Sequence, residues 1–126
     1  MPVIIFYAKI PQQLRREGFV MVTIQDFSQL ELIVAQIKEA QAHPDADKLY
    51  ILKIDTGNGE KQLVAGIRKA YTPEELIGRK IVVINNLEPA VIRGQESQGM
   101  LLAAGGENGP VLLAPEKDVP VGAKIR

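Results

Sequence analysis

The chain has 126 residues, of which 46% are hydrophobic and only 5% aromatic, so it is predicted to form one domain with an aliphatic core. The absence of cysteine excludes disulfides and thiolate chemistry, and the single histidine, His43, excludes a histidine-rich metal site. A formal net charge of zero argues against a protein that holds nucleic acid by bulk charge alone.

No apolar run approaches the roughly 20 residues that a membrane span requires. The apolar N-terminal stretch has no basic residue ahead of it and no small-residue cleavage pattern after it, which makes it a poor signal peptide. The sequence therefore fits a cytoplasmic protein with no membrane partner, and neither a cofactor nor a metal is expected.

The charges are distributed unevenly along the chain. From Lys48 to Arg93 there are eight basic residues and five acidic ones, a surplus of three within a neutral chain. One face of the protein can therefore be basic although the whole surface is not.

Residues 1–20 differ in pattern from the rest of the chain and are interpreted as an N-terminal extension to a domain at 21–126. Val3 to Tyr7 is an apolar candidate strand, and Pro11 opens a short polar helical pattern that Gly18 ends. The extension fits an added terminal strand, a dimer arm or a segment with no role of its own, and the sequence does not separate these.

The first strand of the domain is predicted from Leu30 to about Ala42. Its apolar parity shifts near Ile33 and Val34, which indicates a bulge or a change of neighbouring strand. A strand of this length is typical of a sheet that coils into a small barrel. A turn at 43–47 comes next, with Pro44 and two aspartates as turn formers.

A short helix is predicted later in the chain. Thr72 is its N-cap, Pro73 takes the first helical position, Glu75 completes a capping box and Gly78 ends the helix. The other predicted strands lie at 48–55, 61–65, 79–84, 100–104 and 110–113, with the tail at 118–126 paired at an edge.

Three strands, a short helix, two strands and a C-terminal hairpin extension are the order of an OB-fold, an all-β five-stranded barrel. A β-sandwich would need no helix between its third and fourth strands, and a doubly wound fold would alternate strands and helices throughout. The sequence therefore predicts an OB-fold with additions at both ends.

The stretch at 85–100, NNLEPAVIRGQESQGM, is long for a connection between two strands. Arg93 is a phosphate-seeking cation, Ser97 and Gln98 are hydrogen-bond donors, and Gly94 and Gly99 allow another backbone to approach closely. This content fits a surface that contacts a ligand, and it also fits a long turn whose polar side chains bind nothing.

The tempting catalytic and metal motifs fail on spacing. The pattern G-x-x-S-x-G at 94–99 is one residue off a nucleophile elbow, and Asp45-x-Asp47 lacks the ligands that continue a calcium loop. His43 is interpreted as a turn residue. Because nothing assembles a nucleophile, a base and an oxyanion hole, the protein is predicted not to be an enzyme.

Three motifs in the same order carry a family resemblance: HPDADKLYILKID at 43–55, LVAGIRKAYTPEELIG at 63–78 and NNLEPAVIRGQESQGMLLAA at 85–104. They resemble the dimeric tRNA-binding domain at the C-terminus of many bacterial methionyl-tRNA synthetases, and the free-standing bacterial structure-specific tRNA-binding proteins related to it. The match covers about residues 23–126. The CsaA-type export chaperones, which bind unfolded peptides on the same fold, are the alternative.

The resemblance implies a homodimer that binds tRNA by shape near the outer corner of the L, with an aminoacyl-tRNA synthetase as a possible further partner. OB-folds bind ligands on strands two and three and the flanking loops. The expected tRNA-binding residues are Lys48, Lys53, Lys61, Arg68, Lys69, Asn86, Arg93, Ser97, Gln98 and Met100.

Each of these residues has a plainer interpretation. The lysines can be ordinary solvated strand residues, Asn86 can simply hold the loop, and Met100 can be core packing at the start of a strand. Tyr50 and Tyr71 are the only aromatic residues in the candidate region, so recognition of a folded RNA backbone is favoured over stacking of bases. A modest basic patch binds weakly alone, and two copies on one tRNA would gain through effective concentration.

Overall fold

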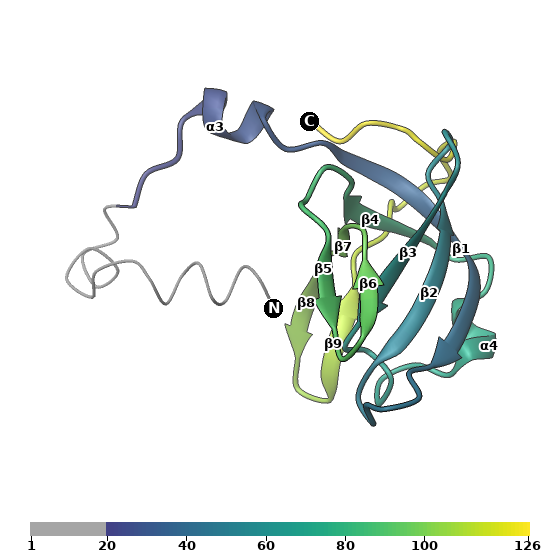
Figure 1. Cartoon of the computed structure of the whole chain (residues 1–126). Coiled ribbons are helices and arrows are strands. Elements are labelled where there is room, and N and C mark those ends of the chain that lie inside the picture. Colours follow the sequence, from purple (N-terminus) through teal and green to yellow (C-terminus); the bar gives the residue numbers. More distant parts are fainter. Residues whose placement is uncertain (1–19) are drawn as a thin grey trace.

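The computed structural model describes residues 20–126, and its centre is a five-stranded antiparallel sheet in the order β3-β2-β1-β4-β7 (Figure 1). The sheet coils into a nearly closed barrel, and the short helix α4 (Pro73–Leu76) stands between β3 and β4 in the chain. The predicted OB-fold with a C-terminal hairpin extension is therefore confirmed. The five strands are β1 (Leu32–Ala42), β2 (Tyr50–Asp55), β3 (Glu60–Ala65), β4 (Lys80–Ile84) and β7 (Met100–Leu101).

The long strand β1 changes neighbours along its length. Its first half pairs with β4, from Leu32 opposite Ile84 onward, and its second half pairs with β2, ending with Ala42 opposite Tyr50. The register shifts between Ile37 and Glu39. A bulge was correctly expected in this strand, but its predicted position near residues 33–34 is wrong.

The loss of apolar alternation around Val34 has another cause. The C-terminal tail lies along this half of β1: the Val34 N–H donates to Ala123 at 2.9 Å, and the Gly122 N–H donates to Val34 at 2.7 Å. Ile33 also forms an isolated bridge with Lys124, which confirms that the tail pairs with a strand. In this half of β1 the barrel covers one face and the tail lies alongside, so consecutive side chains are buried. The alternation of apolar and polar residues therefore does not reveal the register of the strand.

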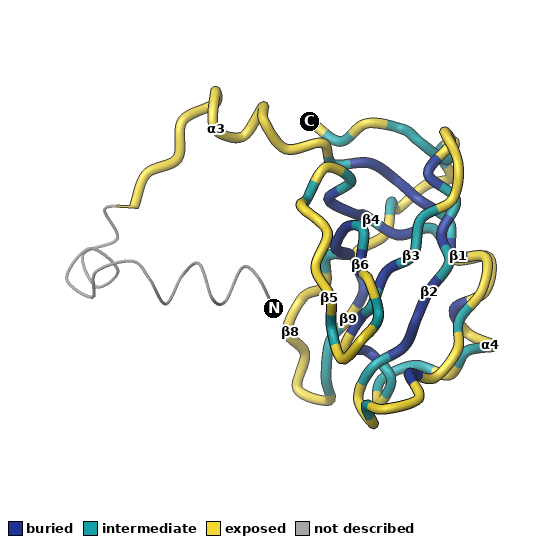
Figure 2. Tube along the Cα trace, in the orientation of Figure 1, coloured by how far each residue is buried: buried dark blue, intermediate teal, exposed yellow. Residues whose placement is uncertain are grey.

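The core is aliphatic, as the composition predicted. The largest fully buried side chains come from four of the strands and from α4 (Figure 2), and each of them contributes about 1.5–3 kcal/mol by burial. They are Ile37, Leu52, Ile54, Leu63, Leu76, Ile81 and Val83. This core fixes the barrel on which the loops are carried.

Helix α4 (Pro73–Leu76) forms with the predicted capping box. The Thr72 side chain accepts from the Glu75 backbone, and the Glu75 carboxylate accepts from the Thr72 N–H at 2.6 Å. Gly78 follows with a φ of 84°, and its N–H donates to Ile37 at 2.8 Å. The helix is thereby fastened to β1, and Leu76 enters the core with no exposed surface.

The stretch at 85–100 contains regular structure that the sequence did not predict. Strands β5 (Ala90–Ile92) and β6 (Gln95–Ser97) pair as a hairpin around a two-residue turn. The single expected strand at 100–104 is divided, because β7 ends at Leu101 and β8 (Ala103–Gly106) leaves the barrel to pair with β9 (Gly109–Leu112).

Helix α3 (Ile24–Ser28) precedes the barrel strands, and the sequence did not predict it. Thr23 caps it, and none of its residues is buried. The expected strand and helical pattern within residues 1–19 lie outside the described residues. Neither helix in the described part of the chain has the length and apolarity to cross a membrane.

Candidate nucleic-acid interface

Three segments distant in sequence meet at one end of the barrel: the turn between β1 and β2, the segment after β3, and the tip of the β5–β6 hairpin. The Arg68 N–H donates to the Lys48 carbonyl at 3.3 Å, and the Arg68 guanidinium donates to the Ala46 carbonyl at 3.1 Å. Lys48 and Lys69 are exposed beside this contact. We call the group formed by Lys48, Arg68, Lys69 and Arg93 the basic end.

Arg93 occupies the hairpin tip. It is exposed and has a φ of 52°, and Gly94 beside it has a φ of 85°. Two consecutive positive φ values are those of a type I′ turn, in which asparagine or glycine is usually found. An arginine in this conformation is uncommon, and it projects a cation beyond the hairpin.

Ser97 and Gln98 fasten the hairpin to β3. The buried Ser97 hydroxyl accepts from the Val64 N–H at 3.0 Å and donates to the Gly99 carbonyl at 3.0 Å. The Gln98 side-chain oxygen accepts from the Gln62 N–H at 2.8 Å, and the Gln98 N–H donates to the Gln62 carbonyl at 2.8 Å. Both side chains thus satisfy the β3 backbone, and their direct contact with RNA stays a prediction.

Gly99 was expected to allow another backbone to approach closely. The backbone that lies close to it is that of strand β4 in the same protein. A Cβ at this position would lie 2.9 Å from the Ile84 carbonyl oxygen and 3.3 Å from a Leu63 methyl. No side chain fits between the end of β6 and strand β4. The glycine therefore allows β7 to start against the barrel.

The lysines of β2 and β3 make internal bonds on the sheet. The Lys53 ammonium donates to the Gln62 side chain at 3.0 Å, and the Lys61 ammonium donates to the Asn85 carbonyl at 2.7 Å. Both lysines are partly exposed, so their positive charge can still attract a phosphate, although each is less exposed than Lys48. Their role in tRNA binding also stays a prediction.

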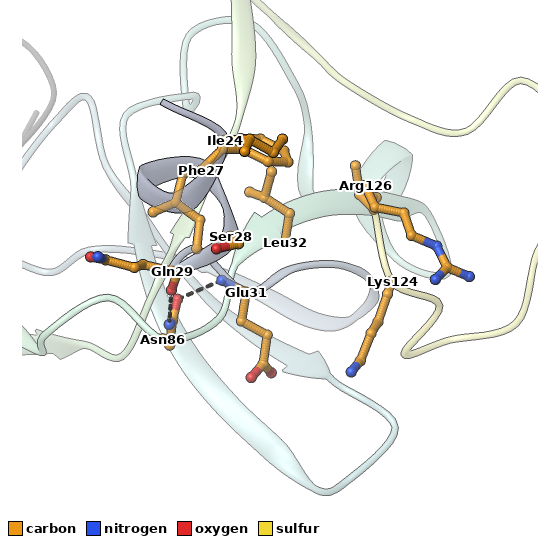
Figure 3. A pocket seen from close by; sticks show the side chains of 11 residues that line it. Ile24, Phe27, Ser28, Gln29, Glu31, Leu32, Asn86, Lys124 and Arg126 are labelled. Atoms are coloured by element: carbon orange, nitrogen blue, oxygen red, sulfur yellow. Dashed lines mark hydrogen bonds between the residues drawn. The ribbon is translucent and has the colours of Figure 1, made fainter. Parts of the chain in front are cut away.

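Asn86 lies at the opposite end of the barrel, below α3. Its side chain donates to the Gln29 carbonyl at 2.7 Å and accepts from the Glu31 N–H at 2.8 Å (Figure 3). The structure therefore separates Asn86 from the basic end and gives it a connection to the start of β1. Its predicted contact with RNA is untested.

Met100 is 9% exposed and packs between two apolar cavities, of about 370 and 200 Å³, that share Val64 and Gly66. The smaller cavity also contacts Leu49 and Ile92, the neighbours of Lys48 and Arg93 in the chain. The burial of Met100 agrees with its interpretation as packing at the start of β7, and its contact with RNA stays a prediction.

The structure also reveals a residue that the sequence identified only as part of a turn. His43 is 2% exposed, and its ring accepts from the Asp45 N–H at 3.0 Å. The other ring nitrogen lies 3.2 Å from the Ile92 carbonyl in the hairpin. The turn role is confirmed, whereas the contact with a residue 49 positions away had no local signal in the sequence.

Residues 32–124 match a family described as "Putative tRNA binding domain". This chain belongs to that tRNA-binding domain family. The predicted resemblance to a tRNA-binding domain is confirmed by the match, which covers the barrel, both hairpins and most of the C-terminal tail.

Two curated relatives are methionine–tRNA ligases. The enzyme of Pyrococcus furiosus is 50% identical over 105 residues, covering 83% of this chain and 14% of the ligase, and that of Methanococcus aeolicus is 54% identical over 109 residues, covering 86% and 16%. The chain thus spans less than a sixth of the length of either of these two ligases. The ligase similarity that was expected from the sequence is confirmed, mostly with archaeal enzymes, while the bacterial, free-standing assignment stays a prediction.

Solved structures with the same fold include one titled a MetRS related protein, from Pyrococcus horikoshii, with a TM-score of 0.78 and 36% identity over 84% of this chain and 98% of that one. A CsaA chaperone protein from Picrophilus torridus has a TM-score of 0.79 and 36% identity, covering 84% of this chain and 100% of that one. Similarity to these structures alone does not separate the tRNA-binding domain from the chaperone branch.

Proposed function

We propose that this chain binds tRNA without catalysis, through the phosphates that the basic end can reach. The observation that carries the proposal is the convergence of Lys48, Lys69 and Arg93, all exposed, from three segments of a tRNA-binding-family domain. Each cation can neutralise a phosphate and release counterions. Exposed Asp45 and Asp47 lie in the same turn as Lys48, so the patch is only modestly basic. Its affinity should fall as salt rises, with a slope set by the few phosphates that it contacts.

Backbone recognition is favoured over base stacking by the positions of the tyrosines. Tyr50 is 5% exposed and its hydroxyl donates to the Tyr71 carbonyl at 2.7 Å. Tyr71 packs against the core, and its hydroxyl accepts from the Leu112 N–H at 3.1 Å. Within residues 20–126 the basic end therefore offers no free aromatic face on which a base could stack. A protein that recognises RNA by the shape of its backbone does not need one.

We further propose that the protein acts as a homodimer and that α3 with the residues around it is the dimer surface. Met21, Val22 and Ile24 are 84%, 68% and 71% exposed, an unusual exposure for large apolar side chains next to one another. Ile24 also lines a cavity of about 480 Å³, together with Phe27, with Leu32 of β1 and with the tail (Figure 3). We call this region the apolar end.

A second copy is the occupant that these observations favour. A helix of five residues with no buried side chain is far below the length at which an isolated helix is stable, so it requires packing. Two copies related by a twofold axis could each place α3 over the other's cavity, as isologous interfaces do. Docking of residues 1–19 is the other outcome, and comparing the sedimentation of the whole chain with that of a chain starting at Met21 separates the two.

Binding of unfractionated tRNA across a salt series tests the proposed function. We expect log K to fall with log salt by about 0.7–0.9 per phosphate contact. Arg93→Ala should reduce both the affinity and this slope, whereas Lys117→Ala, an exposed lysine in the tail, should leave them unchanged. Equal effects of the two substitutions, or an affinity independent of salt, would contradict the proposal.

The second candidate is a chaperone that binds unfolded peptides, and it is favoured by the apolar cavities on either side of Met100. An apolar peptide there would be insensitive to salt and to Arg93→Ala. Competition between tRNA and an unfolded peptide on the same protein decides between the two functions. Under the tRNA proposal the protein would be cytoplasmic and could act together with an aminoacyl-tRNA synthetase.

A further inference from the structure

The two loops that carry the outermost cations of the basic end are joined by His43. This side chain belongs to the turn that continues to Lys48, and its Nε2 lies 3.2 Å from the carbonyl of Ile92, the residue before Arg93. The His43 N–H also donates to the Leu49 carbonyl at 3.0 Å, which closes the turn around Lys48. A single buried residue therefore contacts both loops.

The hydrogen bonds define the state of the imidazole. The Asp45 N–H can only donate, so Nδ1, 3.0 Å away, accepts and carries no proton. The ring proton is then on Nε2 and is donated to the Ile92 carbonyl. Because the residue is only 2% exposed, water does not compete for either bond. The bond to Ile92 is a fixed connection between the turn and the hairpin.

The hairpin depends on such a connection. Strands β5 and β6 pair over three residues each, and a short isolated hairpin is marginally stable. Strand β6 is fastened to β3 through Ser97 and the neighbouring backbone. Among the hydrogen bonds of residues 20–126, the contact with His43 is the one that holds β5 to an element other than β6.

We infer that His43 is a positioning residue for RNA binding, which holds the Arg93 turn against the Lys48 loop so that both cations face one RNA backbone. The inference rests on the proposed function. His43 contacts no phosphate itself; its effect comes from the separation that it sets between the two cations. A backbone of fixed phosphate spacing binds such a pre-set pair more tightly than two independently moving loops.

Two substitutions separate the two ring contacts. In His43→Asn the carboxamide oxygen can take the place of Nδ1 and accept from Asp45, but the side chain is too short to reach Ile92. In His43→Gln the amide nitrogen can take the place of Nε2 and donate to the Ile92 carbonyl. We expect the glutamine variant to bind tRNA nearly as tightly as the wild type, and the asparagine variant to bind roughly three- to tenfold more weakly.

A double-mutant cycle distinguishes positioning from general destabilisation. In an Arg93→Ala background, the difference in affinity between the asparagine and glutamine variants should largely disappear, because the cation to be positioned is gone. Amide chemical shifts supply a readout without RNA: the peaks of residues 92–95 should move in His43→Asn and change little in His43→Gln, while those of α3 stay unchanged in both.

Three outcomes would overturn the inference. Equal tRNA affinities of the asparagine and glutamine variants overturn the positioning role and leave the proposed function intact. A difference between them that persists without Arg93 shows that His43 acts through stability instead. Absence of salt-dependent tRNA binding by the wild-type chain overturns the proposed function and this inference together.

Discussion

The two ends of the barrel use different physical forces. At the basic end Lys48, Lys69 and Arg93 are exposed together with the smaller acidic pair Asp45 and Asp47, and the nearby tyrosines are hydrogen-bonded within the protein. At the apolar end large hydrophobic side chains around α3 are exposed, with Glu31, Lys124 and Arg126 at the cavity beside them. Salt screens the first kind of interaction and does not weaken the second. If both proposals hold, we expect the protein to release RNA as salt rises while it remains associated with a second copy.

The largest effect is expected from Ile24→Asp, which places a charge in the centre of the proposed dimer surface. We expect the dimer to dissociate, and tRNA affinity to fall by about 10²-fold, since a monomer loses the effective concentration of a second site. The fold should be retained because Ile24 is 71% exposed. Sedimentation equilibrium and tRNA titration measure the two quantities.

Val111→Asp is the matched control for this substitution. Val111 is 52% exposed on β9, away from α3, so its variant should remain dimeric. If the Val111 variant dissociates and the Ile24 variant does not, the self-association surface lies on the hairpin side and the assignment of the two ends is reversed.

The next effect concerns how the hairpin of the basic end is held. Ser97→Ala removes the acceptor of the Val64 N–H in a buried place and should lower the free energy of unfolding by about 1–3 kcal/mol. Gln95→Ala removes only a contact of 3.5 Å to Gln62 and should change stability little. Urea unfolding measures both, and equal losses would show that the Ser97 bond does not fasten the hairpin.

These hairpin contacts show what the sequence could not predict. The capping box at Thr72 and the turn signals are local, and the strand order follows from them, so the barrel was predictable. The bond from His43 to Ile92 spans 49 residues, and the acceptor is a backbone carbonyl that has no sequence signature. Ser97 and Gln98 look like free donors in the sequence because only the fold brings the β3 backbone to them.

The bulge and α3 were missed for related reasons. Apolar parity locates a bulge only where one face of a strand is buried, and the tail at Val34 removes that condition. Helix α3 has five residues, too few for a periodic pattern, although the Thr23 and Asp26 side chains form its capping box. A capping box followed by apolar residues was the one signal that could have identified it.

Arg93→Asn should separate the stability of the basic end from its binding. Asparagine followed by glycine is the preferred pair for a type I′ turn, so we expect the variant to gain up to about 1 kcal/mol of stability. Its tRNA affinity should fall, because the cation is lost. Thermal unfolding and tRNA titration should therefore change in opposite directions, and a variant that loses both would show that Arg93 supports the hairpin itself.

The smallest effect is a pH dependence that belongs to neither end. Backbone and side-chain hydrogen bonds with Thr72 lower the pKa of Glu75 below its ordinary value of 4.5, partly opposed by desolvation, with a further contribution from Arg79. A carboxyl group whose pKa is lower in the folded state stabilises the fold above the unfolded pKa, and this contribution disappears as the pH falls through the folded pKa.

In Glu75→Gln the amide can still accept from the Thr72 N–H but does not titrate. The wild type should therefore be slightly more stable than this variant at neutral pH, and the difference should shrink as the pH falls below 4.5 in unfolding measured across that range. Because Glu75 lies on α4, tRNA affinity and self-association at neutral pH should be the same in both proteins, and a change in either would show that α4 contributes to one of the two ends.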